Sequence, residues 1–133
     1  DLEGEGIMNG EESLPEIHNQ IAAGFAGEKF EYIFTHGYNG EYGHERHLGI
    51  HLAVKDLIKN KIITCEKPFF FSYRLDPKKN IINNTKLSNF AIELNNKELA
   101  AKKNIIEEMY GFSKNSPEIL NYCLPKETFT IYY

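Results

Sequence analysis

Four of the five histidines in this 133-residue chain lie within sixteen residues: His36, His44, His47 and His51. The last three are spaced by three and four residues, so in a helix they would share one face. Neutral imidazole is a common zinc ligand, and side chains grouped in this way can form a metal or catalytic site. The alternative is that each histidine is an ordinary polar group at the surface or at the edge of the core. We interpret His51, two turns into the helix, in that second way.

The segments around these histidines predict how they are held. The apolar run Phe30–Phe34 is typical of a buried strand, and a loop punctuated by glycines follows it. A long amphipathic helix then runs from about His44 to Lys59. The loop therefore leaves the carboxyl end of a strand, which is where open α/β sheets bind their ligands. His44 and His47 would lie in the first turn of the helix at that position.

Further helices and strands alternate along the chain. We expect a helix from Ser13 to Gly27 and another from Lys97 to Tyr110, ended by Gly111. The second helix should turn a set of apolar residues toward the core: Leu99, Ile105, Ile106 and Met109. Strands are expected at 69–73, 90–94 and 128–133, and a short helix at 117–122. With no repeat or linker, residues 1–133 predict a single α/β domain whose mainly parallel sheet is covered on both faces.

Composition excludes several classes of protein. The formal net charge is −4 and no basic run is present, so nucleic acid is not an expected partner. No apolar stretch approaches the ~18 residues of a membrane helix, and the acidic amino terminus is unlike a signal peptide. We therefore expect a cytoplasmic protein. Cys65 and Cys123 are far apart and form no CxxC pattern, which predicts reduced thiols.

One motif in this region resembles that of a known family. Thr35-His36 with Gly40-Glu41-Tyr42-Gly43-His44-Glu45-Arg46-His47 resembles the second signature of the LmbE-like, or PIG-L, de-N-acetylases. Members of that family use zinc to remove the acetyl group from N-acetylated amino sugars, including N-acetylglucosaminyl-phosphatidylinositol. A late helix carrying lysine and tyrosine, and a glutamate before an aromatic residue near the end, agree more loosely. The resemblance implies a Rossmann-like fold and a zinc-dependent hydrolase acting on an N-acetylamino sugar.

The resemblance also assigns roles to individual residues of the motif. It makes His47 a zinc ligand and His44 the imidazole that stabilises the oxyanion developing at the scissile amide. Tyr42 would be an assisting donor; equally, it could be a loop aromatic residue packed over the start of the helix. His36 and Glu41 would belong to the substrate pocket, with no role assigned beyond fixing the loop.

One family feature is missing from the sequence. The first family signature, His-Pro-Asp-Asp, supplies a histidine and an aspartate to the zinc and a second aspartate as general base. This chain contains no His-Pro and no Asp-Asp pair. We therefore expect it to be the carboxyl-terminal part of a longer deacetylase that lacks the first strands of its sheet. Because the zinc site would be incomplete, these residues alone should hold zinc weakly or not at all.

The missing strands also predict partners. A sheet without them has an exposed edge, which tends to recruit another strand. We expect the missing amino-terminal segment, or a second copy of the chain, at that edge, in addition to the N-acetylamino sugar substrate. The alternative function is a non-catalytic α/β module that binds a sugar or a partner chain without metal. Tight zinc binding after assembly with the missing segment would favour the enzyme over the module.

Overall fold

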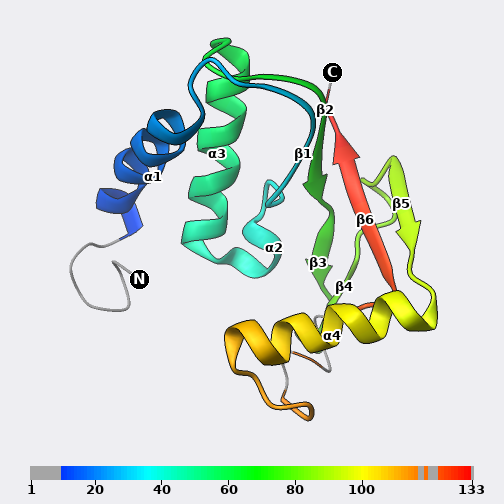
Figure 1. Cartoon of the computed structure of the whole chain (residues 1–133). Coiled ribbons are helices and arrows are strands. Elements are labelled where there is room, and N and C mark those ends of the chain that lie inside the picture. Colours follow the sequence, from blue (N-terminus) through cyan, green and yellow to red (C-terminus); the bar gives the residue numbers. More distant parts are fainter. Residues whose placement is uncertain (1–9, 117–118, 120–122, 133) are drawn as a thin grey trace.

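The computed structural model describes residues 10–116, 119 and 123–132. The chain is a mixed α/β fold, as predicted (Figure 1). Its elements in order are α1 (Gly10–Phe25), β1 (Lys29–Thr35), α2 (Gly40–Gly43), α3 (Glu45–Lys59), β2 (Thr64–Phe71), β3 (Tyr73–Leu75), β4 (Ile81–Asn83), β5 (Phe90–Glu93), α4 (Asn96–Tyr110) and β6 (Lys126–Ile131). The first helix starts before the predicted Ser13. The short helix predicted at 117–122 lies mostly outside the described residues.

The main sheet has the strand order β1-β2-β6-β5. β1 and β2 are parallel, with Phe34 opposite Phe69, whereas β6 is antiparallel to both β2 and β5. β3 and β4 form a separate antiparallel pair. The prediction of a mainly parallel sheet is therefore wrong for the described strands. The reason is that β1, α3 and β2 form one βαβ crossover, while β6 returns along β2 in the opposite direction.

Helices α1 and α3 pack together beside the sheet (Figure 1). Gly49 allows this close approach, because a Cβ at that position would collide with the side chain of Leu14 in α1. Leu57 of α3 is completely buried. The ring of His51 packs edge-on against Phe70 of β2, with 4.9 Å between ring centroids. Part of the core therefore lies between α3 and β2, and it fixes the helix that carries His47.

A second group of side chains forms an aromatic cluster on β1, β2, β5 and β6. Phe34 stacks on Phe69 at 4.7 Å, and Phe129 meets both rings edge-on. Phe69 and Phe129 are buried, but Phe34 is 53% exposed and Tyr32 is 47% exposed. Coverage of both sheet faces is thus not found in the described part of the chain. β1 is an edge strand there, which agrees with the expected exposed edge.

Helix α4 has the predicted ends but not the predicted packing. The Asn95 side chain accepts hydrogen bonds from the backbone N–H groups of Lys97 and Glu98, and Gly111 ends the helix in the left-handed region. The prediction that α4 turns apolar residues toward the core is wrong: α4 has no buried residue, and Met109 is 76% exposed. The local caps define the helix, but no layer covers its apolar side in the described residues.

Candidate functional site

The histidine cluster lies where β1 ends and the chain turns into α2 and α3. Thr35 is the last residue of β1, and His36 and Gly37 follow it directly. A Cβ on Gly37 would collide with the backbone carbonyl oxygen of Phe71 at the end of β2, so this position requires glycine. The close approach of the two backbones places the loop against the carboxyl ends of the parallel strands, as the sequence predicted.

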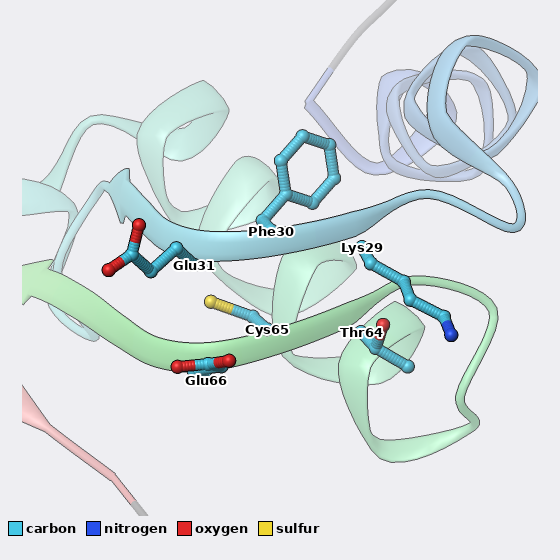
Figure 2. Close-up of a pocket in the computed structure, with 6 residues that line it drawn as sticks. All are labelled: Lys29, Phe30, Glu31, Thr64, Cys65 and Glu66. Carbon is cyan, nitrogen blue, oxygen red and sulfur yellow. The ribbon is translucent and has the colours of Figure 1, made fainter.

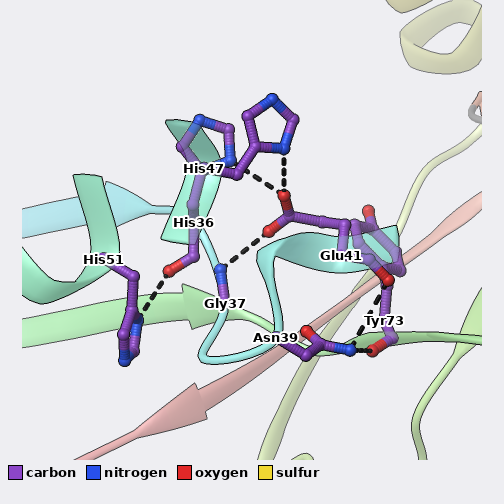
Figure 3. A network of polar contacts seen from close by, with 7 residues as sticks. All are labelled: His36, Gly37, Asn39, Glu41, His47, His51 and Tyr73. Atoms are coloured by element: carbon purple, nitrogen blue, oxygen red, sulfur yellow. Dashed lines mark hydrogen bonds and ion pairs between the residues drawn. The ribbon is translucent and has the colours of Figure 1, made fainter. Parts of the chain in front are cut away.

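Glu41 is the centre of the site (Figure 3). Its Oε2 lies 3.0 Å from Nδ1 of His36 and 2.6 Å from Nδ1 of His47. Its Oε1 accepts a hydrogen bond of 2.7 Å from the backbone N–H of Gly37. One carboxylate thus joins the loop after β1 to the first turn of α3. The sequence assigned Glu41 no role beyond fixing the loop, and the structure adds the two imidazole contacts.

The environment of Glu41 strongly favours its ionised form. Burial of this residue, which is only 6% exposed, opposes ionisation. The hydrogen bonds from His36, His47 and Gly37 outweigh the burial and lower the pKa of Glu41 to about 2. Its backbone is also unusual, with a φ of 59° and a ψ of −54°. Such a conformation costs a non-glycine residue roughly 1–3 kcal/mol and is found most often at functional sites.

Two further rings, those of His44 and Tyr42, join the two imidazoles that contact this carboxylate. The imidazoles of His36 and His47 stack with 3.9 Å between ring centroids. His44 also stacks on His47, with 4.5 Å between ring centroids. Tyr42 lies edge-on to both His44 and His47, at 5.8 and 5.5 Å. The prediction that His44 and His47 lie on one side of the helix start is confirmed. Both the donor and the packing interpretations of Tyr42 fit this position.

His51 lies apart from the carboxylate. It is 2% exposed, and its Nδ1 lies 3.0 Å from the backbone carbonyl oxygen of His36, to which it donates. Burial lowers the pKa of His51, which favours the neutral imidazole. Its contacts agree with the structural role predicted for it. His51 supports the site indirectly, because its hydrogen bond holds the backbone of His36.

His36, Glu41 and His47 together form a possible metal-binding group. Each offers one ligand atom, and the three atoms lie within 4.8 Å of one another. The family resemblance made His47 the ligand and placed His36 and Glu41 in the substrate pocket, but it did not predict that the three side chains converge. A glutamate lying between a histidine-bearing loop and a histidine-bearing helix start was the available signal, because carboxylates commonly orient imidazole ligands. Two imidazoles and a carboxylate accept several divalent ions and are not specific for zinc.

Two shallow hollows lie elsewhere. The larger, about 290 Å³, is at the amino ends of β1 and β2 (Figure 2). It is lined by Lys29, Phe30, Glu31, Thr64, Cys65 and Glu66. The second, about 270 Å³, lies between α1 and α3 and is largely apolar. Neither contains the histidine cluster, so the site is defined by convergence of polar side chains and not by cavity size.

Comparison of the chain with protein-family models, curated proteins and solved structures finds no match. None of the described helices is long and apolar enough to cross a membrane. Both cysteines are free thiols, as predicted: Cys65 is half-buried and Cys123 is buried.

Proposed function

We propose that this chain carries the second-signature half of a zinc-dependent de-N-acetylase that removes the acetyl group from an N-acetylated amino sugar. The observation that supports this proposal is the convergence of His36 and His47 on the buried carboxylate of Glu41 at the carboxyl ends of two parallel strands. The same residues fall in the motif that resembles the family signature. A Rossmann-like sheet belongs to the proposal as well, with the parallel β1–β2 pair as its fragment.

The donor set fits a zinc ion in type. Zinc in proteins is bound by imidazole nitrogen and by carboxylate oxygen, and this cluster offers both. His36, Glu41 and His47 would hold the ion, together with any ligands supplied outside these residues. When bound, zinc lowers the pKa of water to near neutrality and polarises a carbonyl oxygen. Glu41, ionised under all ordinary conditions, supplies negative charge at this position.

The remaining residues of the cluster suit the handling of an acyl group. His44 lies at the start of α3, exposed and stacked on His47, so a substrate amide placed beside His47 would also lie near His44. From there its imidazole would stabilise the oxyanion of the amide in the transition state. Tyr42 is 39% exposed and would donate a hydrogen bond from the same side.

The test is release of free amine from N-acetylglucosamine glycosides by the natural gene product that contains these residues. We expect release with zinc present, its loss after chelation, and its return on adding zinc back. The variant His18→Ala should leave this release unchanged, since His18 bonds to Asp56 on the surface, away from the motif. Absence of amine release from the zinc-loaded protein over a panel of N-acetylated sugars would contradict the proposal.

A non-catalytic binding module is the second candidate, and the open aromatic cluster favours it. Tyr32, Phe34 and Phe90 are each at least 39% exposed, and β1 is an edge strand of the described sheet. An exposed apolar surface of this kind is typical of an interaction site. An amino-terminal segment of the proposed longer deacetylase, or a second copy of the chain, would suit it, because either can pair with β1 and cover the rings. Sugar or partner binding that persists after chelation, without amine release, would favour the module.

A further inference from the structure

We propose that a second cluster, formed by the buried residues Tyr73 and Glu127 and the partly buried Lys102, positions the loop that carries Glu41. This inference deepens the proposed function and takes its catalytic meaning from it. The three residues come from β3, β6 and α4, which meet at the same end of the sheet as α2 (Figure 1). The loose agreement with the family pattern singled out Lys102 and Glu127 separately, but it did not indicate that they act together with Tyr73.

Glu127 is the centre of this second cluster. The Tyr73 hydroxyl donates a hydrogen bond to Oε2 of Glu127, and the Lys102 ammonium group pairs with Oε1. Glu127 and Tyr73 are each 9% exposed. Burial raises the pKa of Glu127 to about 7 and lowers the pKa of Lys102. The carboxyl group is therefore satisfied on both oxygens and tied to two separate elements.

A hydrogen-bonded path runs from Glu127 to the histidine cluster. The backbone carbonyl oxygen of Tyr73 accepts a bond of 3.0 Å from Nδ2 of Asn39 (Figure 3). The same Nδ2 lies 3.5 Å from the backbone carbonyl oxygen of Glu41. Asn39 Oδ1 is buried and has no partner among the described residues, so contacts of Nδ2 orient this amide. A shift of Tyr73 therefore moves the shorter of the two hydrogen bonds made by the Asn39 side chain, two residues before Glu41.

Packing contacts between rings also connect Tyr73 to the histidine cluster. The ring of Tyr73 stacks on Phe71 at 5.6 Å, and Phe71 contacts the imidazole of His36 at 6.5 Å. The carbonyl oxygen of Phe71 is also the group against which Gly37 lies. Tyr73 thus reaches both ends of the loop, one through Asn39 and the other through Phe71. Since Glu41 holds a costly backbone conformation, the loop needs such outside support.

Two variants test this role. Tyr73→Phe removes one hydroxyl and leaves the stacked ring, and Glu127→Gln keeps the shape and removes the charge. Lys126→Met is the matched control, because Lys126 precedes Glu127 on the same strand and its pair with Glu93 is exposed. Hydrogen exchange is followed at the Gly37 amide, which donates to Glu41, and at the Asn60 amide at the far end of α3. Zinc affinity is measured by calorimetry on the same proteins.

We expect exchange at Gly37 to accelerate about fivefold or more in both variants, the effect of one hydrogen bond, with Asn60 and the control unchanged. Zinc affinity should fall by a similar factor. The inference is overturned if exchange at Gly37 stays within twofold of wild type in both variants. It is also overturned if exchange accelerates equally at Gly37 and Asn60, or if both variants fail to fold. Absence of zinc binding by residues 1–133 alone is expected for an incomplete site and leaves the proposed function standing; Gly37 exchange then decides the positioning role by itself.

Discussion

Replacing Glu41 by glutamine should remove a large, pH-dependent part of the stability of this chain. The carboxylate accepts from two imidazoles and one backbone N–H, and a glutamine side chain can satisfy Gly37 but not both imidazoles. A pKa lowered from 4.5 to about 2 corresponds to ~3 kcal/mol of stabilisation at neutral pH. That is a large fraction of the 5–15 kcal/mol that holds typical domains together.

The sign of the pH dependence follows from the direction of the pKa change. Because the pKa of Glu41 is lower in the folded chain, its contribution is complete above pH ~4.5 and is lost as the pH falls toward 2. The measurement is urea unfolding at a series of pH values for wild type and Glu41→Gln. The two curves should differ by ~3 kcal/mol at pH 7 and converge toward pH 2.

The matched control is Glu45→Gln, because Glu45 is an exposed carboxylate in the first turn of α3. It should change stability by less than ~0.5 kcal/mol at any pH in the series, as expected for a surface substitution. A Glu41→Gln curve that parallels the wild-type curve down to pH 2 would refute the reasoning. It would mean that the imidazoles do not bond to the carboxylate in solution.

Three further predictions concern metal, catalysis and association. Residues 1–133 alone should bind zinc more weakly than the longer deacetylase of the proposed function, because the further zinc ligands proposed there lie outside these residues; equal affinity in dialysis would contradict this. In the natural gene product, His47→Ala should lower both zinc content and rate, whereas His44→Ala should retain zinc and lose ~10²–10³-fold in kcat; equal zinc loss would refute that division. Residues 1–133 alone should self-associate through the open aromatic cluster, and Phe34→Lys should shift them toward monomer in light scattering; a monomeric wild type would oppose it.

The sequence by itself determined most of the local elements and the place of the histidine cluster after β1. The strand at Phe30–Phe34, the helix from about His44 and the caps of α4 all depend on neighbouring residues, so their propensities could be read directly. The burial expected for that strand is wrong, because Tyr32 and Phe34 are exposed. The spacing of His44 and His47 likewise predicted their contact, because helix geometry fixes which positions are adjacent. These features need no knowledge of how distant segments meet.

Only the tertiary structure decided the direction of β6, the open face of the sheet and the two carboxylate clusters. The orientation of β6 depends on where the chain returns after α4, which no local pattern records. Glu41 is the centre of the histidine cluster because the folded loop brings His36 against His47, and this contact is visible only in the structure. Glu127 meets Tyr73 across 54 residues, and Lys102 across 25. Such pairs are selected by packing, because a buried carboxyl group must find donors wherever the fold supplies them.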